Sequence, residues 1–215
     1  RRISLAAPGG PRLAGDIWWV GSGAPGVVVL HGIGSGRTSH ADYAGLLAST
    51  GINALALDLR GHGESGGTTD AGMVDDVVAA LDWLAAEGAL RLGIRGSSLG
   101  GFLALNAANR HDAVRAVAAI CPAHHDALAD RRGLVWARDM PLHEAVAADD
   151  GTARGYWHAV GDELVPWPWS QELYRLSPHP RHLRIGMGGH HTSLQHDPAV
   201  QAETVAFLHH WLSRA

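Results

Sequence analysis

The chain has 215 residues, of which 46% are hydrophobic and 18% are charged, a balance that is typical of a globular protein. A formal net charge of −4 provides neither the basic surface that binds nucleic acid nor the cationic face that binds a membrane. No apolar stretch approaches the roughly 20 residues that a transmembrane helix needs. The single cysteine, Cys121, excludes an internal disulfide bond and favours a reducing, cytoplasmic location.

Strand-like and helix-like segments alternate along the chain. Eight short apolar runs predict strands over residues 3–5, 13–20, 27–30, 52–57, 90–94, 114–120, 156–160 and 182–185. Apolar residues at helical spacing predict helices over residues 41–50, 74–84, 99–110 and 199–212, the second of them capped by Thr69 or Asp70. This alternation predicts an α/β fold of one domain over residues 1–215, with a mainly parallel eight-stranded sheet and helices on both faces.

One segment, residues 122–153, does not fit the alternation because it is longer than a single crossover needs. It contains scattered apolar residues with charges between them. Two interpretations stay open: a crossover helix with a long loop, or a small cap inserted over the functional site.

A G-x-S-x-G motif, residues 96–100, stands between a predicted strand and a predicted helix, with Ser98 at its centre. The chain reverses so tightly in this motif that a residue without a side chain is needed on either side of the serine. The serine oxygen is then exposed above the sheet, and the next backbone N–H, that of Leu99, points at a developing oxyanion. The simpler alternative is a glycine-rich turn whose serine caps a helix.

A serine hydroxyl becomes a good nucleophile when an imidazole removes its proton and a carboxylate holds that imidazole. Asp162 follows a predicted strand and a glycine, at the carboxyl end of the sheet where sites assemble. His190 and His191 lie in the loop after the last predicted strand. The chain order of serine, acid and histidine is the order of the strand-turn-helix hydrolases that carry this motif.

Five segments, taken in this order, resemble the serine hydrolases of the α/β-hydrolase superfamily over nearly the whole chain: residues 27–36, 58–65, 96–101, 161–166 and 188–191. The resemblance implies that Ser98 is the nucleophile, Asp162 the acid and a C-terminal histidine the base. A proline often follows the family's histidine by seven positions, and Pro198 therefore favours His191 over His190.

The resemblance also implies an oxyanion hole formed by the N–H groups of Ile33 and Leu99. His31 is then expected to hold the loop that carries Ile33. Asp58 and Arg60 are expected to bind backbone groups or each other within a structural loop.

For the other titratable residues, we expect structural or solvent-exposed positions and no catalytic role. Three aspartates of the long predicted helix are expected to be solvated charges: Asp75, Asp76 and Asp82. His124, His125 and Asp126 could suggest a metal site. Adjacent histidines rarely bind one ion without a third ligand at a suitable spacing, so we expect no metal there. No cofactor is expected either.

Eight tryptophans against two phenylalanines are an unusual ratio. Trp167 and Trp169 alternate with prolines just after the Asp162 loop, and Trp136 lies in the long 122–153 segment. These three side chains either line an apolar substrate pocket or pack as rigid structural groups, and both interpretations stay open.

The sequence thus predicts a hydrolase that cleaves the carboxylic ester of a small-molecule acyl substrate through an acyl-enzyme, without nucleic acid or membrane as a partner. A thioesterase, lactonase, peptidase or acyltransferase would use the same residues. A non-catalytic binding module of the same fold is the alternative from a different class.

Overall fold

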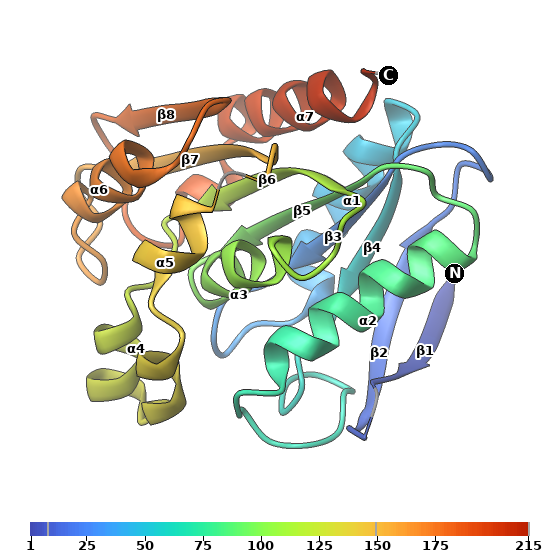
Figure 1. Cartoon of the computed structure of the whole chain (residues 1–215), viewed down its shortest axis with the longest axis horizontal. Coiled ribbons are helices and arrows are strands. Elements are labelled where there is room, and N and C mark those ends of the chain that lie inside the picture. Colours follow the sequence, from blue (N-terminus) through green and yellow to red (C-terminus); the bar gives the residue numbers. More distant parts are fainter. Residues whose placement is uncertain (8, 149, 215) are drawn as a thin grey trace.

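The computed structural model describes residues 1–7, 9–148 and 150–214. These residues form an eight-stranded sheet with the strand order β1-β2-β4-β3-β5-β6-β7-β8 (Figure 1). The strands are β1 (Arg2–Ala6), β2 (Arg12–Trp18), β3 (Gly26–Leu30), β4 (Asn53–Leu57), β5 (Leu92–Ser97), β6 (Val114–Ile120), β7 (Ala153–Ala159) and β8 (Arg181–Gly186). β2 runs antiparallel to β1 and β4, and the remaining pairs are parallel. The predicted α/β class and eight-stranded, mainly parallel sheet are confirmed.

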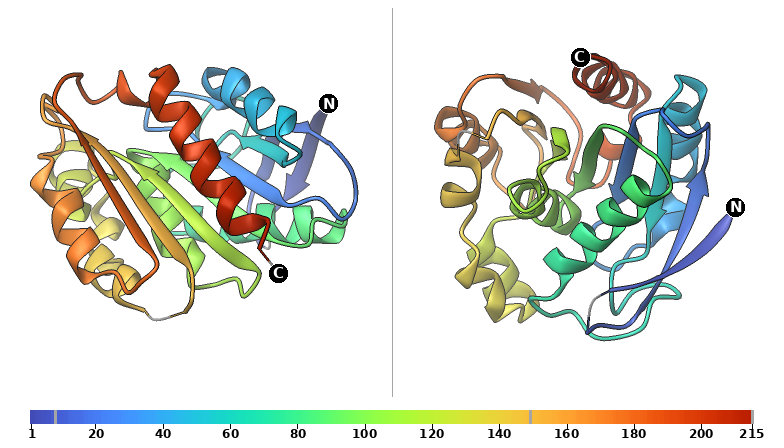
Figure 2. Two further views of the ribbon diagram at one scale, coloured as in Figure 1. Left: turned by 90° about the horizontal axis from the view of Figure 1, so that it is seen from above. Right: turned by 45° about the vertical axis from the view of Figure 1, so that its right-hand side comes forward.

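Helices cover both faces of the sheet. They are α1 (Ala41–Ser49), α2 (Met73–Ala86), α3 (Leu99–Ala108), α4 (His125–Arg132), α5 (Leu142–Ala147), α6 (Pro168–Leu176) and α7 (Pro198–Leu212), with short 3-10 turns η1 (Arg37–His40), η2 (Val135–Asp139) and η3 (Leu194–His196). Figure 2 shows α1 and α7 side by side over one face, and α2, α3 and α6 pack on the other. None of the described helices combines the length and apolar character that a membrane span requires.

Strand β3 consists of glycine and apolar residues, and both of its faces are covered. All residues of β3 and β4 are buried. Val28 points into the core beneath α2 and α3, whereas Val27 and Val29 point into the core beneath α1 and α7. A continuous Val-Val-Val-Leu run is therefore what a doubly covered parallel strand requires.

The cap that the sequence predicted for helix α2 is wrong. Its N-cap is Gly72, not Thr69 or Asp70. The Asp70 carboxylate instead accepts hydrogen bonds from the Gly72 N–H at 2.9 Å and from Arg60 at 2.6 Å. Because its carboxylate binds Arg60 of a neighbouring loop, Asp70 lies outside the helix, about one turn before the first residue of α2.

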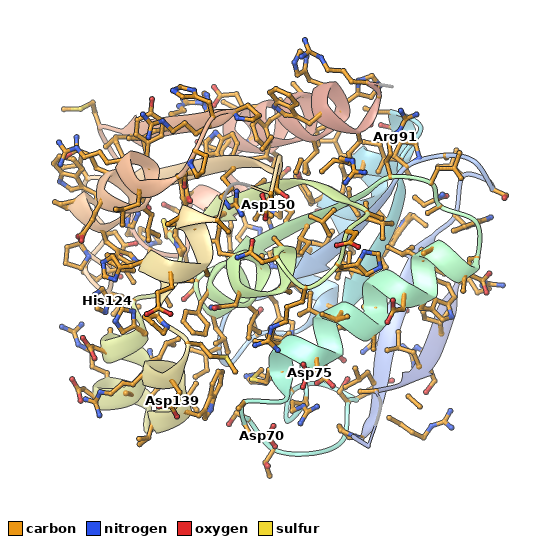
Figure 3. The ribbon with its side chains drawn as sticks, in the orientation of Figure 1. Asp70, Asp75, Arg91, His124, Asp139 and Asp150 are labelled. Atoms are coloured by element: carbon orange, nitrogen blue, oxygen red, sulfur yellow. The ribbon has the colours of Figure 1, made fainter. Side chains whose placement is uncertain are left out.

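The prediction that three aspartates of α2 are solvated is wrong for Asp76. This side chain is fully buried and accepts two hydrogen bonds of 2.6 Å from the Arg60 guanidinium. Asp75, labelled on α2 in Figure 3, and Asp82 are exposed as predicted. The buried face of α2 meets the loop after β4, and the arginine that this loop carries needs a carboxylate there.

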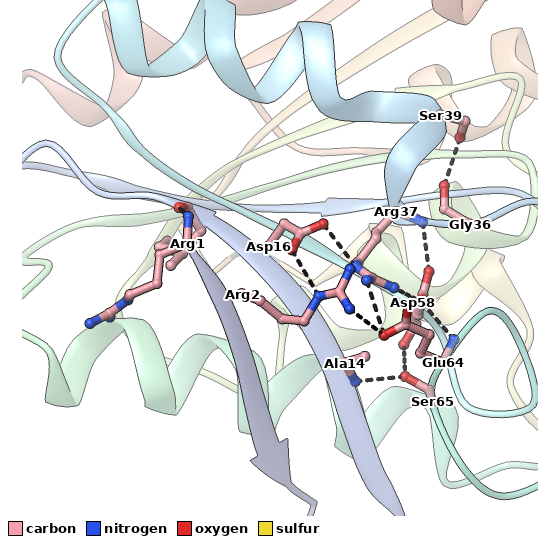
Figure 4. A network of polar contacts seen from close by, with 11 residues as sticks. Arg1, Arg2, Ala14, Asp16, Gly36, Arg37, Ser39, Asp58, Glu64 and Ser65 are labelled. Atoms are coloured by element: carbon pink, nitrogen blue, oxygen red, sulfur yellow. Dashed lines mark hydrogen bonds and ion pairs between the residues drawn. The ribbon is translucent and has the colours of Figure 1, made fainter.

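A second network of polar side chains ties the loop after β4 to the loop after β3 (Figure 4). The Asp58 carboxylate accepts the backbone N–H groups of Arg37 at 2.7 Å and Glu64 at 2.9 Å, and it pairs with the Arg37 guanidinium. Burial by itself raises the pKa of the Asp58 carboxyl, but these bonds outweigh burial and lower that pKa. The predicted backbone contacts of Asp58 are confirmed, whereas Arg60 pairs with Asp70 and Asp76 and not with Asp58.

The long 122–153 segment contains α4, η2 and α5. α5 packs against α3 and α6 and so extends the helical layer on the sheet, whereas α4 packs against η2 at the edge of the molecule (Figure 1). One end of the segment is therefore ordinary crossover structure, and the other end is free to border a site.

Candidate active site

Ser98 sits in a sharp turn between β5 and α3, with φ +53° and ψ −117°. Its N–H donates to the Ile120 carbonyl at 2.9 Å, and its carbonyl accepts from Phe102 and Ala123, both at 3.0 Å. A non-glycine residue in this backbone region is strained, at a cost of about 1–3 kcal/mol, and persists only when its surroundings fix it. These three backbone bonds supply that fixation.

The two glycines of the G-x-S-x-G motif are required by close backbone packing. A Cβ placed on Gly96 would lie 2.1 Å from the Gly100 carbonyl oxygen, and a Cβ on Gly100 would lie 2.6 Å from the Leu30 carbonyl oxygen. Because no side chain intervenes, the first turn of α3 comes against the ends of β3 and β5. This packing places Ser98 at the carboxyl edge of the parallel strands.

His191 bridges Ser98 and Asp162. Its Nδ1 is 2.7 Å from the Asp162 carboxylate, and its Nε2 is 2.9 Å from the Ser98 hydroxyl. A carboxylate only accepts, so Nδ1–H donates to Asp162 and Nε2 accepts the Ser98 O–H. His190 is exposed and its Nδ1 contacts the Thr192 hydroxyl at 3.2 Å instead. The structure thus brings Ser98, His191 and Asp162 together and leaves His190 outside.

The Asp162 side chain is fully buried and bound on both oxygens. One oxygen accepts the N–H groups of Leu164 at 2.9 Å and Val165 at 2.8 Å, and the other faces His191 and His158. Burial by itself raises the pKa of this carboxyl, but the hydrogen bonds from His158, His191 and Val165 outweigh burial and hold the pKa well below its usual range. Asp162 is therefore ionised at neutral pH.

His158 is a member of this site that the sequence analysis missed. It is fully buried, with Nε2 2.9 Å from the Val165 carbonyl and 3.2 Å from Asp162, and Nδ1 2.6 Å from the Ser170 hydroxyl. Both partners of Nε2 only accept, so Nε2 carries hydrogen and donates to them. The available signal was a histidine four residues before the acid, within β7, a strand whose residues are all buried.

Among the described residues, two groups of side chains have ligand atoms near enough to one another to be considered for a metal ion. In the first, Cys121 lies beside His158 and Asp162, but these two are already bonded to each other, and burial raises the pKa of the Cys121 thiol well above its usual value. In the second, His124 Nδ1 accepts the Asp126 N–H and caps α4. Both groups are used within the fold, and neither offers an open set of ligands.

The loop after β3 lies against Ser98. A Cβ on Gly32 would come 3.3 Å from the Ser98 Cβ, so the following residue, Ile33, is next to the serine. His31 holds this loop: Nδ1–H donates to the Gly32 carbonyl at 2.7 Å, and Nε2 accepts the Leu59 N–H at 3.0 Å. Burial lowers the pKa of His31 to about 4, so the ring is neutral, as an accepting Nε2 requires.

A cavity of about 260 Å³ opens beside Ser98. Its walls come from the loop after β3, from α4, from the loop after Asp162 and from the loop that carries His191. The lining is mainly apolar, with Ile33, Leu128 and Val165 among its members, and Arg131 and Arg132 add two positive charges. One end of the 122–153 segment therefore borders the site through α4.

The three tryptophans that were candidates for a pocket are not among the residues that line this cavity in the described part of the chain. Trp136 packs its ring edge on Phe102 at 6.1 Å between centroids, and Trp169 is buried against the His124 ring at 4.1 Å. Trp167 is the N-cap residue of α6. Trp136 and Trp169 therefore pack against neighbouring side chains, Phe102 of α3 and His124 before α4, which favours the structural interpretation for these two.

This fold and this arrangement of side chains define the α/β-hydrolase class. A family model described as "Serine aminopeptidase, S33" matches residues 24–146, and the chain belongs to that family of α/β hydrolases.

Relatives and solved structures agree with this assignment. The chain is 25% identical over 229 aligned residues to YfhR of Escherichia coli (strain K12), described as an uncharacterized protein, with 96% of this chain and 79% of that protein covered. It superposes on the α/β hydrolase GrgF from Penicillium sp. sh18 with a TM-score of 0.86 and 15% identity, over 100% of this chain and 99% of that chain. The Pyrococcus furiosus esterase Pf2001 gives a TM-score of 0.81 and 22% identity, over 99% of this chain and 92% of that chain. At these identities the two structural likenesses show the fold alone.

Proposed function

We propose that the protein is a serine hydrolase that cleaves carboxylic esters through an acyl-enzyme, with Ser98, His191 and Asp162 as its catalytic residues. The observation that carries this proposal is the unbroken chain of hydrogen bonds from the Ser98 hydroxyl through His191 to the Asp162 carboxylate. Serine, histidine and aspartate in this geometry and tautomeric state are the parts that nucleophilic acyl transfer needs.

The reaction proceeds in two halves. His191 Nε2 takes the Ser98 proton as the oxygen attacks the acyl carbon, and the N–H groups of Leu99 and Ile33 bind the oxyanion. Leu99 is the first residue of α3, so its N–H has no acceptor within the helix. His191 then donates the proton to the leaving alkoxide, and water, activated by the same imidazole, releases the acid.

The lining of the cavity favours an ester over a peptide with a free amino terminus. The family description names an aminopeptidase, and such an enzyme needs a carboxylate to bind the substrate ammonium group. Among the described residues that line the Ser98 cavity there is no aspartate or glutamate. The structural likeness to the Pyrococcus furiosus esterase Pf2001 also supports an ester over a peptide, because it shows an esterase with this fold.

The test is hydrolysis of 4-nitrophenyl esters of increasing acyl length by the wild type and by Ser98→Ala, His191→Ala and His190→Ala. We expect kcat to fall by at least about a thousandfold in the first two variants and to change little in His190→Ala. The chain length with the highest kcat/KM then measures the acyl pocket.

A fluorophosphonate label separates the alternatives. Labelling of Ser98 without ester turnover would direct the assignment to a thioester, lactone or peptide bond. If the wild type shows no ester turnover and Ser98 is not labelled, the hydrolase proposal is rejected and a binding module is supported.

A further inference from the structure

We infer that the site selects substrates that carry a negatively charged group, such as a free carboxylate, and that Arg131 and Arg132 bind this group at the mouth of the Ser98 cavity. The inference rests on the proposed function, because it assigns a substrate class to the same site. Nothing in the three catalytic residues themselves demands an anionic substrate.

Both arginines lie in the last turn of α4, the helix that borders the cavity, and both are among the residues that line it. Gly133, with φ +71°, ends the helix directly after them. A helix C-terminus favours positive side chains, but that effect alone acts equally on a side chain that faces solvent. Here both arginines are among the residues that line the cavity beside the serine hydroxyl.

The charges of these two arginines are not neutralised by neighbouring carboxylates. Within the part of the chain that the structure describes, neither residue forms an ion pair. The acids of the same helix, Asp126 and Asp130, both pair with Arg138 of η2. Glu163, the residue after Asp162, has a carboxylate oxygen 3.4 Å from the His191 nitrogen and is not in the lining. The cavity therefore has two positive charges and no opposing one, in a protein of net charge −4.

Arg131 is also held in place. Its Nη1 donates to the Leu164 carbonyl at 3.2 Å, which lies in the loop directly after Asp162. This bond links α4 to the far wall of the cavity and uses one of the five N–H donors of the guanidinium. The remaining donors, with those of Arg132, match the planar oxygen pair of a carboxylate.

The rest of the lining restricts where the charge can lie in a substrate. Apart from the arginines, much of the lining is apolar, with Ile33, Ala127, Leu128 and Val165 among its members. A fitting substrate has a short apolar portion next to the ester bond and its anionic group at the far end of that portion. An aliphatic half-ester of a dicarboxylic acid has this chemistry.

Two matched esters test the inference. Mono-(4-nitrophenyl) glutarate and 4-nitrophenyl pentanoate have the same leaving group and acyl length, and they differ in the terminal carboxylate. We expect the wild type to have a higher kcat/KM for the glutarate ester, and the ratio of the two values to fall about tenfold or more in Arg131→Gln/Arg132→Gln. Added salt should lower the wild-type ratio, because the attraction between these exposed charges is screened. 3-Carboxy-4-nitrophenyl pentanoate, which carries the charge on the leaving group, shows which side of the ester the arginines serve.

Arg115→Gln is the control for loss of a positive charge outside the cavity. This arginine is exposed, donates to the Asp112 and Val114 carbonyls and is not in the cavity lining, so its loss removes one positive charge, as each single substitution of the double variant does. A ratio that stays the same in the double variant, while pentanoate turnover persists, would overturn the inference and leave the proposed function standing. If no ester is turned over, the proposed function fails, and calorimetric binding of free glutarate to the wild type and the double variant decides on the anion site alone.

Discussion

At the scale of single residues, two histidines, His191 and His158, bind the same oxygen of the Asp162 carboxylate. His158 Nε2 lies 3.2 Å from the same oxygen that accepts the His191 Nδ1–H at 2.7 Å. His158 is locked by Ser170 on its other nitrogen and by the Val165 carbonyl. The buried imidazole therefore fixes the direction of the carboxylate and stabilises its charge without touching the cavity.

His158→Leu should lower kcat about tenfold and leave KM nearly unchanged, because a hydrogen bond to a charged group is lost at a position that contacts no substrate. His158→Gln should recover most of kcat, since an amide N–H can donate to the same acceptors. Steady-state kinetics on a 4-nitrophenyl ester measures both values. Equal losses in the two variants, or a change confined to KM, would contradict a positioning role.

The placement of a site residue was predictable from the sequence where the residue follows the end of a strand. It was not predictable where it depends on which side chains are buried together. Ser98, Asp162 and His191 each lie in the segment that follows a strand, in motifs whose spacing is visible in the sequence. Asp76 and His158 look like ordinary members of a helix and a strand, because the sequence does not show which arginine or carboxylate faces them.

At the scale of elements, the site depends on how closely α3 approaches the sheet. Gly100→Ala should destabilise the fold by roughly 3 kcal/mol, because its Cβ would overlap the Leu30 carbonyl and the backbone must move. Gly101→Ala is the matched control in the same helical turn: its Cβ would lie no nearer than 3.1 Å, from Pro122. Urea denaturation of the two variants compares them, and an equal loss of unfolding free energy in both would contradict the packing argument.

The strands were predicted more accurately than the helices of the 122–153 segment, and the physical reason is burial. Strands such as β3 are apolar runs whose two faces are covered, so the residue types alone indicate where the strand begins and ends. α4 is a charged helix of eight residues that a His124 cap, a Gly133 end and contacts with η2 hold in place. Tertiary contacts of this kind leave little periodicity in a sequence.

At the scale of the whole molecule, buried neutral histidines make the stability depend on pH. Burial lowers the pKa of His31 to about 4 and that of His40 to about 2, and both rings are almost fully inaccessible to solvent. The unfolded chain binds protons at these positions near pH 6.5, whereas the native state does not. Stability is therefore complete above pH 6.5 and falls as the pH drops toward 4.

The expected loss of unfolding free energy between pH 7 and pH 5 is on the order of 3 kcal/mol for these two histidines, from about 1.4 kcal/mol per proton per pH unit. Urea unfolding at several pH values measures the slope. The double variant His31→Gln/His40→Gln should have a flatter slope whatever its absolute stability. An unchanged slope would show that other groups take up the protons.

The backbone angles of Ser98 have a consequence for how this lineage changes over time. A serine at φ +53° makes the folded state less stable than glycine would at the same place, so selection for folding alone acts against the hydroxyl. Under the proposed function, continued demand for the reaction keeps serine there. Descendants that are recruited for another purpose are thus free to drift toward glycine at this position, and its identity across a lineage records whether the chemistry is still in use.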